Sequence, residues 1–120
     1  MSPKRESYDY ISDILDAMSK AQKFLQGVSY ESFLRDDKTQ AAVEREIEII
    51  GEAAGNIPNS IHKKYPEIPW QKIIGMRNKL AHEYFGVRIM IVWNVVKEDI
   101  PVIQPLFEKL WQDYIHENKE

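Results

Sequence analysis

The octapeptide at residues 77–84, RNKLAHEY, gathers side chains that together could act on a phosphate-containing substrate. Arg77 carries a planar guanidinium that stays charged and can donate two parallel hydrogen bonds to phosphate oxygens. His82 is a residue type whose unperturbed pKa, about 6.5, suits a general acid or base near neutrality. Asn78, Lys79 and Tyr84 add hydrogen-bonding groups and a second positive charge. The pattern therefore predicts acid–base chemistry beside a bound anion.

Helical geometry limits how these side chains can meet. At about 100° per residue, Arg77 and Tyr84 lie within roughly 20° of each other, and Asn78 and His82 share a second face. On that face the amide of Asn78 could fix the orientation of the His82 ring. Arg77 and His82 are roughly 140° apart, so one straight helix cannot direct both at one atom. Either the helix ends near His82, which Gly86 favours, or a second copy of the chain completes the site.

The distribution of charge favours an anion-binding role for this region. The whole chain has a net charge of −3, but residues 58–88 carry six cations and two carboxylates, a net +4, which leaves −7 for the rest. The six cations are Lys63, Lys64, Lys72, Arg77, Lys79 and Arg88.

A structural interpretation of the motif is also open, because a histidine near a helix end commonly caps carbonyl groups and a single arginine commonly lies in a solvated ion pair.

Composition and periodicity predict an all-α fold that would hold the motif in place. The 120-residue chain has only five glycines, and its apolar residues recur at three- and four-residue spacing. We expect a single domain over residues 1–120, an up-and-down antiparallel bundle of four to five main helices plus short helical turns, and an oligomer that would bury further surface. The expected elements are a helix from Ser2–Pro3 to Gly27, a turn over Tyr30–Leu34, a helix over Asp37–Gly55, a short helix over Ser60–Tyr65, a motif-bearing helix from Pro69–Trp70, and a last helix after Val87 that Pro101 and Pro105 kink without ending.

Small residues near the end of the Asp37–Gly55 helix predict close approach of a neighbouring helix. Gly51, Ala53, Ala54 and Gly55 leave little side chain between two backbones, and the glycines cost helix propensity that packing must offset. Glu52 lies among them. A second interpretation is that its carboxylate projects into a cleft.

Several kinds of site are disfavoured by what the sequence contains. The chain has no cysteine, and His62, His82 and His116 do not have the spacing of metal ligands, so we expect no metal site and no cofactor. No apolar run resembles a signal peptide or a membrane span, so a soluble cytoplasmic protein without membrane contact is the expectation.

The motif Arg-x4-His-x-Tyr and its flanks resemble the HepT-like branch of the HEPN superfamily. The resemblance extends over about residues 5–112 and includes DYISDILDAM at 9–18, AVEREIEIIGEAAGNIP at 42–58, YPEIPWQKIIGMRNKLAHEYFGV at 65–87 and VWNVVKEDIPVI at 92–103. The motif itself shows no departure from the family pattern.

This resemblance implies a metal-independent ribonuclease that acts as the toxin of a type VII-like toxin–antitoxin pair, with RNA, tRNA being one candidate, cut at the cleft of a symmetric homodimer. His82 would be the general base or acid and Arg77 the transition-state clamp. Asn78 would orient His82 or bind phosphate, Lys79 would add positive field, and Tyr84 would position the substrate. The partner would be an MntA-like nucleotidyltransferase antitoxin that attaches AMP to Tyr84.

Two other functions are alternatives to this one. A non-catalytic helical module that binds a nucleotide or a partner protein would need the same fold and no cleavage. A nucleotidyltransferase is excluded, because the sequence lacks a Gly-Ser turn followed by paired carboxylates that would hold magnesium.

Overall fold

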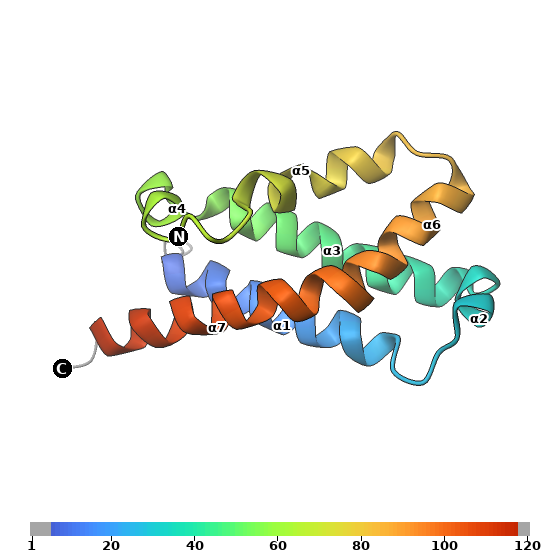
Figure 1. Ribbon diagram of the computed structural model, residues 1–120, viewed down its shortest axis with the longest axis horizontal. Coiled ribbons are helices and arrows are strands. Elements are labelled where there is room, and N and C mark those ends of the chain that lie inside the picture. The colour runs from blue at the N-terminus through green and yellow to red at the C-terminus, as the bar shows by residue number, and fades with distance from the viewer. Residues whose placement is uncertain (1–5, 118–120) are drawn as a thin grey trace, which may run out of the picture.

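A computed structural model describes residues 6–117, and within this range the chain is helical with short turns and without strands (Figure 1). Its elements are α1 (Ser7–Phe24), α2 (Tyr30–Leu34), α3 (Asp37–Asn56), α4 (Asn59–Lys64), α5 (Trp70–Ala81), α6 (Phe85–Asn94), the π-helical turn η1 (Val95–Asp99) and α7 (Ile100–Glu117). The all-α prediction is confirmed. Ser2 and Pro3, predicted to begin the first helix, lie outside the described residues.

The long helices run back and forth. In Figure 1, α1, α3, α5 and the arm formed by α6 and α7 alternate in direction. Helix α3 packs against both α1 and α5, and α1 also packs against α7. Helix α3 therefore makes the most extensive contact between the motif-bearing α5 and the rest of the bundle.

The core consists of apolar residues that recur every three or four positions on the long helices. The largest fully buried side chains include Phe33, Phe107, Ile11, Ile14, Met18, Val43, Ile89 and Val92. Each such residue stabilises the fold by about 1.5–3 kcal/mol relative to an exposed position. No helix within residues 6–117 has both the length and the apolar composition needed to cross a lipid bilayer.

Side-chain caps explain where two of the helices begin. The Ser29 hydroxyl accepts a hydrogen bond from the Ser32 backbone N–H at 3.1 Å, and α2 starts at the next residue. The Asp36 carboxylate accepts from both the hydroxyl and the backbone N–H of Thr39, which lowers the pKa of Asp36, and α3 starts at Asp37. Both starts agree with the prediction from sequence.

The last helical arm contains a widened turn directly before its first proline. Helix α6 starts at Phe85, three residues before the predicted start at Arg88, and η1 connects it to α7. In η1 the Ile100 N–H bonds to the Val95 carbonyl five residues earlier. In a regular α-helix the ring of Pro101 would clash with the carbonyl of Lys97, and a turn of wider radius at this point relieves that clash. Both Pro101 and Pro105 lie within α7, so the prediction that neither ends the helix is confirmed.

Helices α3 and α5 pack so closely that their backbones nearly touch at Gly51. A Cβ atom at Gly51 would lie 3.2 Å from the carbonyl oxygen of Ile73 and 3.7 Å from that of Ile74. The predicted close packing at the small residues of α3 is therefore confirmed. At the start of α5, the Trp70 ring meets Phe107 edge-on at 5.4 Å and its Nε1–H donates to the Tyr65 carbonyl at 3.0 Å. These contacts fix the helix that carries the motif.

Candidate active site

The motif extends from the last turn of α5 into the connection with α6. Helix α5 ends at Ala81, and His82 occupies the C-cap with φ −106° and ψ 8°. Tyr84 is the N-cap of α6, and its carbonyl accepts from the Arg88 N–H. The prediction that the helix ends near His82 is confirmed. The role given to Gly86 is wrong, because Gly86 lies in the first turn of α6 and the connection contains no residue with positive φ.

The end of α5 changes how the motif side chains are related. Because regular helix stops at Ala81, the face that a continuous helix would give to Arg77 and Tyr84 does not exist. Asn78 and His82 make no hydrogen bond to each other or to any other side chain within residues 6–117. All five motif side chains are exposed, and Tyr84 is 87% exposed. These groups are accessible to a large substrate or partner.

Arg77 is the motif residue with a side-chain partner in the described part of the chain. Its Nη1 lies 3.2 Å from Oε1 of Glu52, an ion pair that joins α5 to α3. Glu52 is exposed beside the small residues of α3 and lines a cleft between α1 and α3, as the second interpretation of that segment predicted. The pair links positions 25 residues apart.

A cleft adjoins this ion pair, between α3, α5 and α6. It encloses about 300 Å³, and the residues that line it are Glu44, Glu48, Arg77, Leu80, Ala81 and Arg88. Arg88 donates to the carboxylate of Glu44, and this hydrogen bond raises the pKa of Arg88. The Nε of Arg88 is buried without a hydrogen-bond partner in the described structure. One copy of the chain thus places Arg77 in the cleft, while His82 and Tyr84 lie outside its lining.

Glu44 and Glu48 of this cleft were not singled out by the sequence reasoning. Glu44, Glu48 and Glu52 follow one another at four-residue spacing on α3, so they form a carboxylate stripe along one face. That spacing was a signal available in the sequence. The arginines that pair with the two ends of the stripe could be assigned only from the fold.

The folded chain neutralises much of the positive charge that residues 58–88 carry in the sequence. Four of the six cations in residues 58–88 pair with carboxylates from other parts of the chain: Lys64 with Glu117, Lys72 with Asp99, Arg77 with Glu52 and Arg88 with Glu44. Within the described residues, Lys63 and Lys79 make no ion pair. Lys79 is therefore the unpaired cation within the motif.

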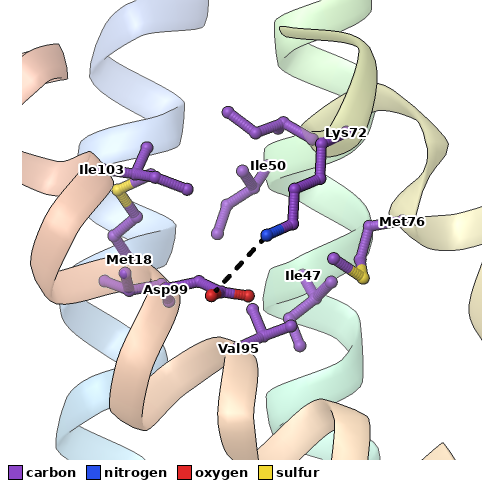
Figure 2. Close-up of a pocket in the computed structure, with 10 residues that line it drawn as sticks. Met18, Ile47, Ile50, Lys72, Met76, Val95, Asp99 and Ile103 are labelled. Atoms are coloured by element: carbon purple, nitrogen blue, oxygen red, sulfur yellow. Dashed lines mark ion pairs between the residues drawn. The ribbon is translucent and has the colours of Figure 1, made fainter. Parts of the chain in front are cut away.

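A second pocket lies in the bundle and contains no motif residue. Figure 2 shows its apolar side chains, contributed by α1, α3, α5 and the η1–α7 region, with Lys72 and Asp99 paired at 3.8 Å beside it. Its volume, about 30 Å³, is far below the roughly 300 Å³ or more of small-molecule sites. This pocket is a gap in core packing and too small for a nucleotide.

Helix α6 presents apolar side chains to solvent directly after the motif. Phe85 is 58% exposed, Met90 45% and Val87 40%.

Within residues 6–117, no group of three or more His, Cys, Asp or Glu side chains is placed to hold a metal ion. The site as described consists of cationic, imidazole, amide and phenol groups beside an exposed apolar surface.

Comparison with known proteins agrees with this description. Residues 14–110 match the family described as ribonuclease HepT-like. A Thermococcus cleftensis protein named "Probable ribonuclease HepT" is 50% identical over 107 residues, which cover 89% of this chain and 97% of that protein. Two Methanocaldococcus jannaschii proteins, each named "Putative RNase", are 42% identical over 111 residues, covering 92% of this chain and 92% and 96% of theirs. No solved structure shows a significant match. The chain belongs to the HepT-like ribonuclease family, and the resemblance drawn from the motif is confirmed.

Proposed function

We propose that this chain cleaves RNA without a metal ion, by attack of a 2′-hydroxyl on the adjacent phosphorus. The observation that carries the proposal is the motif of a ribonuclease family, whose five candidate side chains are exposed at the end of α5, with Arg77 in a cleft of about 300 Å³. His82 takes the proton of the 2′-hydroxyl as the 2′-oxygen bonds to phosphorus. The bond from phosphorus to the 5′-oxygen breaks and that oxygen takes a proton from water, while the His82 imidazolium returns its proton to solvent. The products are a 2′,3′-cyclic phosphate and a 5′-hydroxyl.

The remaining motif residues have supporting roles in this mechanism. The guanidinium of Arg77 stays charged and binds the non-bridging oxygens as negative charge develops on them. Lys79, unpaired among the described residues, adds positive potential at the same helix end. Asn78, four residues before His82, would bind phosphate or orient the His82 ring when substrate is bound, and Tyr84 positions the substrate.

The active form in this proposal is a homodimer of single-domain subunits that brings two motifs to one cleft. Two features support it. His82 does not line the cleft that contains Arg77, so one copy does not place both groups in that cleft. The exposed Phe85, Val87 and Met90 form an apolar surface next to the motif, and burying it against a second copy would be favourable.

The proposal extends to regulation as the toxin of a type VII-like toxin–antitoxin pair. An MntA-like nucleotidyltransferase antitoxin would transfer AMP to the hydroxyl of Tyr84. The support is the 87% exposure of Tyr84, which leaves it accessible to a second enzyme, and its place beside the proposed substrate-binding groups. Each AMP would add negative charge and bulk where RNA phosphates must bind.

Incubation of the purified protein with total cellular RNA in EDTA tests the ribonuclease proposal. Wild type should cleave, Arg77→Ala and His82→Ala should not, and His116→Ala, which changes an exposed histidine on α7, should cleave as wild type does. An intact mass establishes beforehand that Tyr84 carries no AMP. Unmodified wild type that leaves RNA intact would contradict the proposal and favour a non-catalytic nucleotide- or partner-binding module.

A further inference from the structure

We propose that Glu52 is a positioning residue for Arg77 in the cleavage reaction, an inference that rests on the ribonuclease function proposed above. The carboxylate Oε1 of Glu52 lies 3.2 Å from Nη1 of Arg77. Nothing in the motif itself supplies such a contact, because the other four motif side chains make no hydrogen bond or ion pair within residues 6–117. Glu52 therefore holds the one motif cation that lines the cleft.

Close packing of α3 against α5 fixes the positions of the two backbones that carry Glu52 and Arg77. Gly51, next to Glu52, brings α3 so close to α5 that an added Cβ would lie 3.2 Å from the Ile73 carbonyl oxygen. On either side of Glu52 the α3 residues Ile50 and Ala53 are buried, as is Met76 beside Arg77 on α5. The backbones under both charged side chains are thus packed in the core. A short, direct contact between them follows from this packing.

Stability alone does not explain the pair. The side chains of Arg77 and Glu52 are 62% and 44% exposed, and ion pairs as open as this contribute little to the free energy of unfolding. The ion pair instead restricts the orientation of the Arg77 guanidinium. Glu52 engages one of the five N–H donors of Arg77 and leaves the others for phosphate oxygens, so the long side chain is already ordered when RNA binds.

A carboxylate in this position has two opposite consequences for the reaction. It limits the orientations of Arg77 and so favours the transition state, which raises kcat. It also competes with phosphate for the same cation and so weakens binding of the RNA ground state. Removal of Glu52 should therefore lower kcat and at the same time tighten RNA binding. A residue that only maintains the fold would not produce this combination.

Steady-state cleavage of a defined oligoribonucleotide, with binding of its 2′-O-methyl analogue, tests the inference. In Glu52→Ala, kcat should fall about tenfold, and the Kd for the uncleavable analogue should fall about two- to fivefold. Glu52→Gln keeps an acceptor oxygen and loses the charge, so the Kd should fall similarly while kcat stays within about threefold of wild type. Thermal unfolding of each variant checks that the fold is retained.

Glu117→Gln is the matched control. It removes a carboxylate from another exposed ion pair, with Lys64 at 2.9 Å, in α7 and away from the motif. This variant should change neither kcat nor Kd, and a similar tightening of binding here would assign the effect to net charge instead of to Arg77.

The outcomes separate the inference from the function on which it rests. If wild type cleaves and Glu52→Ala keeps its kcat, or binds the analogue more weakly, the positioning role is refuted and the ribonuclease proposal stands. If unmodified wild type does not cleave, both fail. The NMR signal of the Arg77 Nε–H gives a readout apart from activity: it should show slower side-chain motion in wild type than in Glu52→Ala, and equal motion would refute the pairing.

Discussion

Replacing His62 with alanine should destabilise the fold and leave cleavage intact. Replacing His82 should leave the stability nearly unchanged and remove cleavage. The His62 ring stacks on Trp70 with centroids 4.1 Å apart and an interplanar angle of 21°. Its Nε2–H donates to the Ala54 carbonyl at 3.0 Å, which ties α4 to the end of α3. A stacked aromatic pair contributes about 1 kcal/mol, and a hydrogen bond of this kind about 1 kcal/mol. We therefore expect His62→Ala to lower the free energy of unfolding by about 2 kcal/mol.

His82 has no comparable contacts. Its side chain is exposed and makes no hydrogen bond within the described residues, so His82→Ala should change the free energy of unfolding by less than about 0.5 kcal/mol. Loss of a general acid–base group should lower the cleavage rate at least about a hundredfold.

Urea unfolding followed by tryptophan fluorescence and circular dichroism measures the first quantity, and RNA cleavage in the same buffer, well below the unfolding midpoint, measures the second. Two results would refute the reasoning. Wild-type stability in His62→Ala would mean that the stack and the hydrogen bond contribute nothing, and undiminished cleavage by His82→Ala would remove His82 from the chemistry.

Three further predictions follow from particular contacts. Burial and the hydrogen bond to Asp113 raise the pKa of Tyr65 to about 12, so the folded state favours the protonated phenol. The stabilisation that the protonated Tyr65 phenol gives the folded state is complete below about pH 10 and is lost as the pH rises to 12. In unfolding titrations across that range, the stability of wild type relative to Tyr65→Phe should therefore fall by about 2 kcal/mol. A constant difference in stability would contradict this prediction. Gly51→Ala should cost about 1–3 kcal/mol in urea unfolding, because the new Cβ would press on the α5 backbone, and unchanged stability would show that the helices separate freely. Phe85→Glu should leave a folded monomer in sedimentation analysis without cleavage activity, whereas a variant that stays dimeric would place the interface elsewhere.

Features that depend on neighbouring residues in sequence were predicted well. The α2 turn over Tyr30–Leu34 and the start of α3 at Asp37 follow from caps that act over three residues, at Ser29 and Asp36. The continuity of α7 through its prolines followed from the apolar periodicity, which a helix break would have shifted. The end of α5 near His82 was predicted with the wrong cause, since Gly86 belongs to α6.

Features that depend on contacts between helices could not be predicted from the sequence. The pairing of Arg77 with Glu52 and of Arg88 with Glu44 requires the distance between α3 and the two helices that follow it. The same contacts neutralise cations that a count along the chain had treated as free. For Arg77 and His82 the sequence left two arrangements open, a helix end near His82 or a second copy of the chain. The helix does end beside His82, and Arg77 lines the cleft of one copy whereas His82 does not. The dimer stays a prediction.

The measurement that tests the account most directly uses an oligoribonucleotide with a single 2′-deoxy substitution on the 5′ side of the cleaved phosphate. Unmodified wild-type protein in EDTA should cut the all-ribose strand and leave a 2′,3′-cyclic phosphate and a 5′-hydroxyl, identified by mass. It should leave the substituted strand intact, because the attacking hydroxyl is absent. Cleavage of the substituted strand, or products with a 5′-phosphate, would mean that water attacks the phosphorus and would contradict the roles given to His82 and Arg77.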